Sequence, residues 1–198
     1  MLENARIVHP SYKYDSQVKR ELRNFSGTLN FAPMQKFKIV LWVLLQNSIF
    51  KSAFLPSRVR PILLKLFGAS IGSGVVIRRG VRIHFPWNLE IGNDCWIGEE
   101  VWFINHAKIV IESDVCLSQR SVICSGGHDF RSSTLEYKHR QVLIKSGAWI
   151  CFDAKILPGV IIGINSVISA GEVTRVSVPD YTLQINGDFL QIKPPDNV

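Results

Sequence analysis

Histidines are the side chains of this sequence best suited to carry protons near neutral pH, because the unperturbed imidazole pKa is about 6.5. The chain has five, at positions 9, 84, 106, 128 and 139. His128 is the strongest candidate for chemistry, since two glycines precede it and their small size lets a ligand approach the backbone closely. Asp129 follows, and it could orient the imidazole ring, contact a ligand or cap the loop. His84 and His139 are predicted to be polar surface residues.

The composition is that of a globular protein with a basic surface. Of the 198 residues 46% are hydrophobic and 20% are charged, and the formal net charge is +7. The length suits one main domain, with or without an appendage. The charge favours anionic partners such as acidic glycans, anionic lipid or a phosphorylated cofactor, although a merely soluble basic surface is the other interpretation. Nucleic acid is not favoured, because no run of five or more Lys and Arg residues occurs.

Cysteine usage and hydropathy indicate the compartment. The four cysteines, at 95, 116, 124 and 151, form no Cys-X-X-Cys pair and are predicted to be small buried or half-buried side chains without disulfides. This fits a reducing compartment. The first residues lack the features of a signal peptide, and the most apolar run, 37–45, is far shorter than the roughly 20 residues that cross a bilayer. We therefore expect a cytoplasmic protein, which could still touch the inner face of the membrane.

Residues 1–69 form an N-terminal segment that is predicted to contain two helices. Residues 34–50 have apolar positions at helical spacing, and residues 58–67 resemble a second short helix with Gly68 as its C-terminal stop. Both helices carry basic residues, namely Lys36, Lys38, Lys51, Arg58, Arg60 and Lys65. We expect the segment to cap the open end of the domain that follows. Docking of the same basic and apolar segment on a membrane surface is the alternative.

From residue 71 onward, a large apolar residue recurs every six positions. The positions are Ile71, Ile77, Ile83 and Leu89, then, after a shift of two, Ile91, Ile97, Phe103 and Ile109, then Ile111, Leu117 and Ile123, and, after an interruption, Ile144, Ile150, Ile156, Ile162 and Ile168. A period of six fits neither a helix nor a hairpin, but it fits a three-sided prism with one short strand on each side. The sequence therefore predicts a mainly β fold, a left-handed parallel β-helix over residues 70–175 with a tail at 176–198.

Residues 124–143 interrupt the repeats. This stretch is polar, charged and contains glycine, and it includes His128. We expect a loop that is expelled from the prism, because polar residues without the six-residue period cannot fill an aliphatic core. Loops on a rigid scaffold often carry function.

The motifs between the repeats resemble those of the hexapeptide-repeat acyltransferases. These motifs are Leu66–Gly72 (LFGASIG), Pro86–Gly92 (PWNLEIG), Leu117–Gln119 (LSQ), Gly127–Asp129 (GHD), Gly147–Ile150 (GAWI) and Leu157–Gly163 (LPGVIIG). They are most similar to acetyltransferases of colanic acid and other exopolysaccharides, and to the galactoside and maltose acetyltransferase group. Residues before 60 do not match that subfamily well. Asn186–Phe189 stand where the family usually has Gly-Asn-Pro-Ala.

The resemblance implies an O-acetyltransferase that moves an acetyl group from acetyl-CoA to a sugar hydroxyl, without a metal. The acceptor would be a sugar or glycan, free or lipid-linked, in exopolysaccharide, O-antigen or capsule biosynthesis. His128 would be the general base, with Asn105, Asp129 and His106 on the acceptor side; Asn105 also fits a structural role at a corner. The donor side would use Trp149, Ser169, Ala170, Gly171 and Arg175. The resemblance also implies a homotrimer with its sites between subunits.

Three alternatives remain open at this point. The acceptor could be an amino sugar or a xenobiotic, or the prism could be a non-catalytic binding module. A metal site is the third, because His84, His106 and His128 are spaced evenly by 22 residues, as in a three-histidine site of a β-helical carbonic anhydrase. Coils of about 20 residues would move each histidine by two positions, so we do not expect the three to stack.

Overall fold

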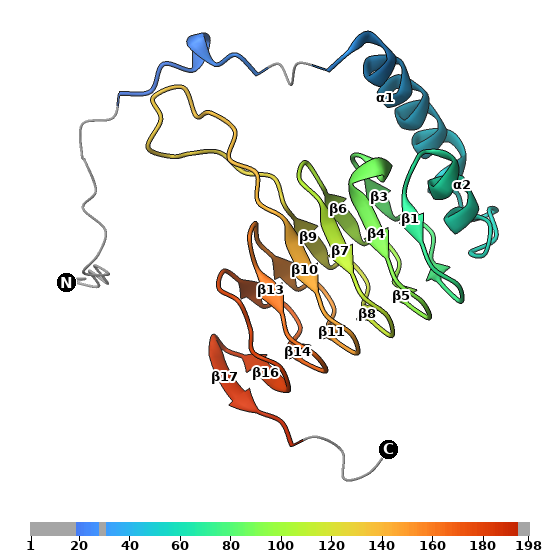
Figure 1. Cartoon of the computed structure of the whole chain (residues 1–198), viewed down its shortest axis with the longest axis vertical. Helices are drawn as coiled ribbons and strands as arrows, with labels where there is room; N and C mark the ends of the chain where they lie inside the picture. Colours follow the sequence, from blue (N-terminus) through green and yellow to red (C-terminus); the bar gives the residue numbers. More distant parts are fainter. Residues whose placement is uncertain (1–18, 28–30, 194–198) are drawn as a thin grey trace, which may run out of the picture.

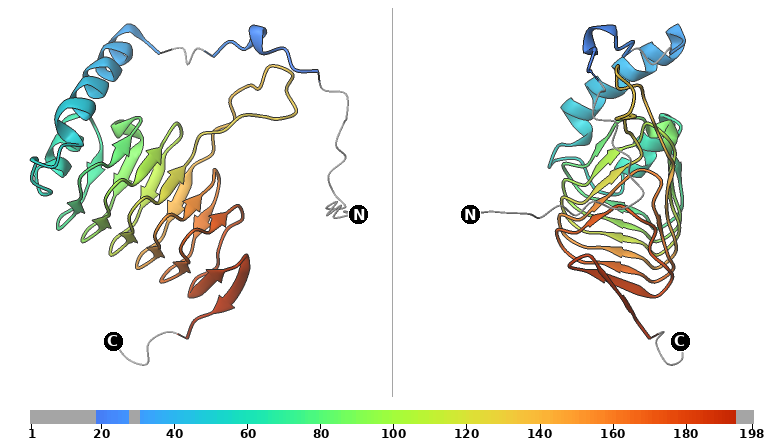
Figure 2. Two further views of the ribbon diagram at one scale, coloured as in Figure 1. Left: turned by 180° about the vertical axis from the view of Figure 1, so that it is seen from behind. Right: turned by 90° about the vertical axis from the view of Figure 1, so that its left-hand side faces the viewer.

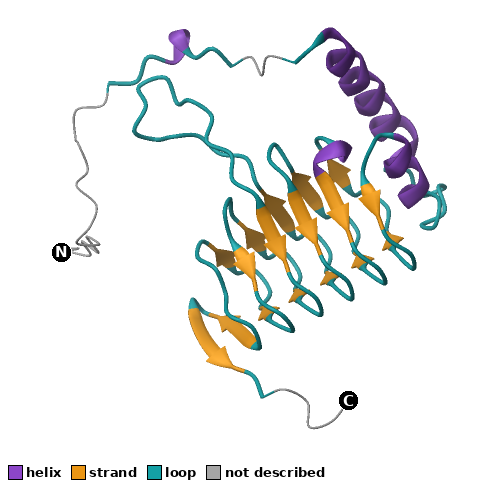
Figure 3. Ribbon diagram, viewed as in Figure 1, coloured by secondary structure: helices purple, strands orange, loops and turns teal. Residues whose placement is uncertain are grey.

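The computed structural model describes residues 19–27 and 31–193. Its centre is a left-handed parallel β-helix, a prism whose three faces are three parallel sheets (Figures 1 and 3). Sheet A contains β1 (Ser70–Ile71), β4 (Leu89–Ile91), β7 (Ile109–Ile111), β10 (Val142–Ile144) and β13 (Ile161–Ile162). Sheet B contains β2 (Val76–Ile77), β5 (Trp96–Ile97), β8 (Cys116–Leu117), β11 (Trp149–Ile150), β14 (Val167–Ile168), β16 (Thr182–Ile185) and the antiparallel β17 (Asp188–Gln191). Sheet C contains β3 (Arg82–Ile83), β6 (Trp102–Ile104), β9 (Val122–Cys124), β12 (Lys155–Ile156) and β15 (Val173–Thr174).

The six-residue period is confirmed as the origin of the core. Every residue predicted to point inward is at most 6% exposed. Successive coils pair residues of the same type, so that Ile71 pairs with Ile91 and Ile91 with Ile111. The two-residue shifts arise because β4 and β7 are three-residue strands with an inward side chain at each end. An aliphatic ladder thus runs along each face, and its burial supplies the main driving force for folding.

The corners of the prism depend on small or left-handed residues. An added Cβ on Gly92 would lie 2.7 Å from the backbone nitrogen of Ser113, so the next coil passes too close for any larger residue. At the following turn, Asp94 and Asp114 have φ values of 54° and 61°. Asp and Asn tolerate this region better than other residues with a side chain, which explains their recurrence after the aliphatic-glycine pair.

Both predicted helices are present, and they cover the open end of the prism (Figure 1). They are α1 (Pro33–Leu45), which continues into a π-helical turn η2 (Gln46–Phe50), and α2 (Arg60–Leu66). Gly68 follows α2 with a φ of 90°, as its predicted role as a stop requires. Trp42 is fully buried, and its indole nitrogen donates to the carbonyl of Ile83 at 2.7 Å.

Arg60 anchors this helical cap to the first coil. Its guanidinium is 1% exposed and donates to the carbonyls of Phe50, Ser52 and Ile77. Burial, and then the charge of Arg78, lower the pKa of Arg60. The carbonyl oxygens near the end of η2 offset the free-energy cost of burying the charged guanidinium, because the carbonyl end of a helix carries a partial negative charge.

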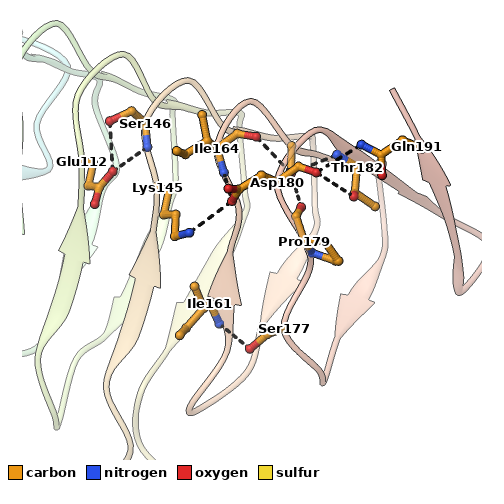
Figure 4. Close-up of polar contacts among 11 residues, drawn as sticks. Glu112, Lys145, Ser146, Ile161, Ile164, Ser177, Pro179, Asp180, Thr182 and Gln191 are labelled. Carbon is orange, nitrogen blue, oxygen red and sulfur yellow. Dashed lines mark hydrogen bonds and ion pairs between the residues drawn. The ribbon is translucent and has the colours of Figure 1, made fainter. Parts of the chain in front are cut away.

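The coil continues past residue 175, where the sequence predicts only a tail. Strand β16 pairs in parallel with β14, and β17 returns antiparallel along it. Figure 4 shows how this end is tied down, with Asp180 accepting from the backbone of Ile164 and from Lys145. These two donors lower the pKa of Asp180, the backbone one most. The extension was missed because these residues lack the aliphatic-glycine signature of the earlier coils.

The expelled loop is confirmed, and it occupies residues 125–141 between β9 and β10. It leaves the prism and lies beside the N-terminal residues around η1 (Leu22–Asn24), as Figures 1 and 2 both show. Arg20 donates to the carbonyls of Phe130 and Ser132, each at 2.7 Å. The N-terminal segment therefore covers the loop as well as the end of the prism.

The predicted state of the cysteines is also confirmed. All four are free, Cys95 buried and the others half-buried.

Candidate active site

Four histidines gather at the corner where the chain passes from sheet C to sheet A. His84 follows β3, His106 follows β6, and His128 and His139 lie in the loop after β9. His9 lies outside the described residues. Because each coil turns at the same corner, residues far apart in the sequence come together here, and the loop adds its own side chains to those of the prism.

His128 is exposed and held in a defined orientation. Its Nδ1 lies 2.6 Å from the carbonyl oxygen of Leu135. A carbonyl only accepts, so Nδ1 carries a proton, and in the neutral form of the ring Nε2 has a free lone pair. Phe25 and Tyr137 pack against the ring, with centroid distances of 5.6 and 5.1 Å. The backbone carbonyl therefore sets the tautomer of the ring, and the two aromatic side chains hold its orientation.

The other three histidines form a contiguous cluster. Nδ1 of His84 lies 3.2 Å from Nε2 of His106, and the rings of His106 and His139 stack at 4.9 Å. Two of their nitrogens, Nδ1 of His106 and Nε2 of His139, are buried without a hydrogen-bond partner in the described part of the chain. Buried polar atoms usually have partners, so these two nitrogens hold unused hydrogen-bonding capacity at this corner.

The cluster is neutral at pH 7. Burial lowers the pKa of His106 to about 4, and the neighbouring histidines, His84 first, add to the shift. Burial is also the main cause that lowers the pKa values of His84 and His139. Each ring therefore has one donor and one acceptor nitrogen for hydrogen bonding.

One prediction about these histidines is wrong. His84 and His139 are half-buried rather than surface residues, because the loop folds back over the corner. His84 and His106 do meet, although the coils pair Ile83 with Phe103 and so leave the histidines two positions out of register. The imidazole rings reach across this offset where the chain turns. Within residues 19–27 and 31–193, no group of three His, Cys, Asp or Glu side chains is placed to hold a metal ion.

Two hollows meet at His128. The first, here called the histidine hollow, has a volume of about 160 Å³ and is lined by His106, His128, Tyr137 and His139. The second, the basic hollow, has about 460 Å³ and is lined by His128 together with Asp129, Phe130, Arg131, Lys138, Arg140, Leu157 and Pro158 among others. His128 therefore separates a neutral polar space from a cationic one.

Asn105 and Asp129 support this corner from within the chain. Asn105 is fully buried; its Oδ1 accepts from the backbone nitrogens of His84 and Phe85, and its Nδ2 donates to the carbonyl of Phe85. Asp129 accepts from the backbone of Arg131 at 3.0 Å and lies 3.5 Å from Lys138. The hydrogen bond from Arg131 is the largest of the causes that lower the pKa of Asp129. The hydrogen bonds of Asn105 thus hold the backbone at His84 and Phe85, and those of Asp129 hold the loop next to His128.

The residues expected on the donor side lie elsewhere on the prism. Trp149 is 48% exposed on sheet B, and its indole nitrogen donates to Ser118. Ser169, Ala170 and Gly171 form the turn from sheet B to sheet C. Arg175 is exposed and follows β15, at the same corner as the histidines. Within one chain, Trp149 and residues 169–171 are therefore separated from His128 by a face of the prism, whereas Arg175 is at the same corner as His128.

Comparison with known proteins identifies the family. No family model matches the chain. WcaF of Escherichia coli K12, which carries the name of a colanic acid biosynthesis acetyltransferase, is 35% identical over 163 residues, covering 81% of this chain and 88% of WcaF. The chain belongs to the WcaF-like acetyltransferases. The family predicted from the motifs is therefore confirmed, and so is the assignment as an acetyltransferase.

Solved structures confirm the fold of this WcaF-like protein. A maltose O-acetyltransferase from Clostridium difficile 630 superimposes with a TM-score of 0.70 at 20% identity, covering 82% of this chain and 90% of that one. The hexapeptide-repeat acetyltransferase VCA0836 of Vibrio cholerae, in complex with acetyl-CoA, gives a TM-score of 0.68 at 23% identity, covering 77% and 84%. Both share the hexapeptide-repeat prism.

Sequence reasoning missed Phe25, Tyr137 and His139 as parts of the site. The sequence did contain a signal for Tyr137 and His139, which flank Lys138 in the expelled loop. Such alternation is typical of an extended segment whose every second side chain lies on the same face. An isolated antiparallel bridge between His128 and Tyr137 shows this pairing. No comparable signal marks Phe25, whose place follows only from the contact between the N-terminal segment and the loop.

Proposed function

We propose that this WcaF-like protein transfers the acetyl group of acetyl-CoA to a sugar hydroxyl in polysaccharide biosynthesis, with His128 as the general base. The observation that carries the proposal is the hydrogen bond from Nδ1 of His128 to Leu135, which leaves Nε2 as a proton acceptor at the border of two hollows. The Vibrio cholerae neighbour, an acetyltransferase, is in complex with acetyl-CoA. The name of WcaF refers to the biosynthesis of colanic acid, which is a polysaccharide.

The reaction requires one proton acceptor and two aligned substrates. Nε2 of His128 takes the proton of the acceptor hydroxyl while its oxygen attacks the thioester carbonyl of acetyl-CoA. The tetrahedral intermediate then expels the CoA thiolate, which receives the proton from His128. The new ester and free CoA are the products. The enzyme returns to its starting state without having formed a covalent bond to the acetyl group.

The histidine hollow is the acceptor side in this proposal. A sugar offers several hydroxyls, each both a donor and an acceptor. Nδ1 of His139 accepts from the backbone N–H of Gly127, so the neutral ring carries its proton on Nε2, which can donate to a hydroxyl oxygen. Nδ1 of His106 donates or accepts according to the tautomer of that ring. Both rings are neutral at pH 7 because burial lowers their pKa values, so they add no charge that would favour an anionic acceptor. Asn105 acts as a positioning residue for the corner, and Asp129 for the loop.

The donor side is completed by a second copy of the chain. Trp149 and the turn at 169–171 lie on a different face and edge from His128, so they can serve the same CoA molecule only if they come from a neighbouring subunit. A homotrimer with three sites between subunits provides such neighbours by cyclic symmetry. In it, Trp149 would line the pantetheine path, Ser169, Ala170 and Gly171 would offer small or backbone surfaces, and Arg175 would meet phosphate. Because acetyl-CoA is available in the cytoplasm, the proposed reaction would take place there.

The test of the proposed function is product analysis. Purified protein is incubated with acetyl-CoA and a panel of glycans, lipid-linked sugars and amino sugars, and thiol release is followed together with product mass. We expect acceptor-dependent thiol release and a product heavier by one acetyl group, which mild alkali removes because it is an ester. An alkali-stable product would instead indicate an amide, and therefore an amine acceptor. Absence of any acceptor-dependent release would contradict the enzyme assignment.

Replacing Trp149 with alanine should raise KM for acetyl-CoA by about tenfold and change kcat little. The indole is half-exposed and would contribute binding energy shared by ground and transition states, which affects KM alone. Trp96→Ala is the matched control, since Trp96 is 46% exposed in the same column of sheet B, where both tryptophans pair with Cys116. Steady-state kinetics with acetyl-CoA as the varied substrate decide, and equal KM values for the two variants would remove Trp149 from the donor site.

A further inference from the structure

The outward face of α1 is apolar. Met34, Phe37, Val40, Leu41 and Leu44 are between 43% and 76% exposed, whereas Trp42 on the opposite side is fully buried against the prism. Their spacing of three and four residues places them on one side of the helix. We name these five residues the cap face. A contiguous apolar surface of this kind on a folded protein usually marks an interaction site.

Further apolar side chains are exposed in the rest of the helical cap. Phe54 in the turn after η2 is 97% exposed, and Ile62 and Leu66, one helical turn apart on α2, are 58% and 75% exposed. Neither helix is long and apolar enough to cross a membrane, and this holds for every helix in residues 19–27 and 31–193. The cap therefore offers an apolar surface at the end of the prism without a spanning segment.

The stretch of chain that contains the cap face has charged residues of a single sign. No Asp or Glu occurs between Glu21 and Glu90, and this stretch contains ten Lys and Arg residues, namely Arg23, Lys36, Lys38, Lys51, Arg58, Arg60, Lys65, Arg78, Arg79 and Arg82. Only Arg78 and Arg79 form ion pairs with a described residue, both with Glu99. A second copy of the same surface would bring cations against cations, so self-association through this face is disfavoured.

We propose that the cap face docks on an anionic lipid bilayer. Apolar side chains on the outward side of a short helix, in a stretch of chain that has lysine and arginine but no acidic residue, match the acyl and headgroup layers of such a surface. In an assembly with cyclic symmetry, equivalent cap faces lie at the same height along the axis, so several would bind one membrane together.

Docking would bring the acceptor side of the enzyme close to the membrane. Phe31, just before α1, packs on Phe85 at 5.6 Å, and Phe85 lies 5.2 Å from His106 in the histidine hollow. A sugar carried on a membrane lipid would then reach the histidine hollow from the bilayer. This last consequence rests on the proposed function, whereas the docking itself does not.

Vesicle binding of the full-length protein tests the proposal. We expect flotation with vesicles of phosphatidylglycerol and phosphatidylcholine, weaker flotation at high salt, and little with phosphatidylcholine alone. The double variant Phe37→Glu/Leu44→Glu should bind the anionic vesicles at least about tenfold more weakly, because two apolar groups are lost and charge of the wrong sign is added. The matched control is Phe189→Glu/Leu190→Glu, which alters an exposed apolar pair on β17 and should bind like the unaltered protein.

Several outcomes would overturn the proposal. They are absence of binding by the unaltered protein, equal binding to neutral vesicles, and equal losses in both double variants. If light scattering shows that only the α1 variant changes oligomeric state, the face is a contact between subunits instead. Acetyl transfer to a water-soluble acceptor should be unchanged in the α1 variant, so failure of the docking proposal is distinguishable from failure of the proposed function.

Discussion

Replacing His128 with alanine should lower kcat for acetyl transfer by about 10²–10⁴-fold, the usual contribution of a general base. The imidazole is exposed, so its removal leaves the core intact and the unfolding temperature close to that of the unaltered protein. KM for acetyl-CoA should change little, because the ring acts on the acceptor proton. The measurement is thiol release at saturating acetyl-CoA and acceptor, together with a thermal unfolding curve.

Tyr137→Phe is the control for that variant. It keeps the ring that packs on His128 and removes only the hydroxyl that donates to the carbonyl of Gly27 at 3.2 Å. Its kcat should stay within a few-fold of the unaltered value. Undiminished turnover in His128→Ala would show that another group takes the proton, and equal losses in both variants would indicate a loop defect rather than a missing base.

The variant Asn105→Leu should lower the free energy of unfolding by about 2–6 kcal/mol, from one backbone group left unpaired and two further hydrogen bonds lost. It removes hydrogen bonds to three backbone groups in a fully buried place, the N–H groups of His84 and Phe85 and the carbonyl of Phe85. The N–H of Phe85 is left without a partner, whereas the N–H of His84 still donates to Phe103 and the carbonyl of Phe85 still accepts from Asn88. Each buried backbone group without a partner costs about 1–3 kcal/mol. Since the same corner carries the histidine cluster, activity of the folded fraction should also fall. Denaturant unfolding monitored by circular dichroism measures the change.

The matched control changes an asparagine at another corner. Asn93 is exposed, and its Oδ1 accepts from the backbone and hydroxyl of Ser73, so Asn93→Leu should cost only about 1 kcal/mol. Asn105→Asp should fall between the two, because a carboxylate still accepts from both N–H groups but cannot donate to Phe85. Similar stabilities for the Asn105 and Asn93 leucine variants would contradict the structural role of Asn105.

The prism, the helical cap and the expelled loop were predictable from the sequence. Ile91 and Ile111 show why, since coils that differ by 20 residues repeat the same environment at the same phase, and the repeat imprints itself on residue types. Helix limits were less predictable: the first helix ends as a π-helical turn at Phe50, within the predicted range, and the second begins two residues late at Arg60. The structured end around β16 escaped prediction because its residues do not repeat the earlier pattern.

The sequence by itself determined which residue types repeat, and therefore the β-helix, the family and the place of His128 in the interruption. Only the tertiary structure decided what surrounds His128. Arg20 and Ser132 meet across 112 residues, and His84 meets His106 across an offset that the repeat does not share. Contacts between neighbouring coils recur at nearly constant separation and so leave a period in the sequence. Contacts made by the loop and the N-terminal segment occur once each, at separations set only by how the whole chain packs, and so leave none.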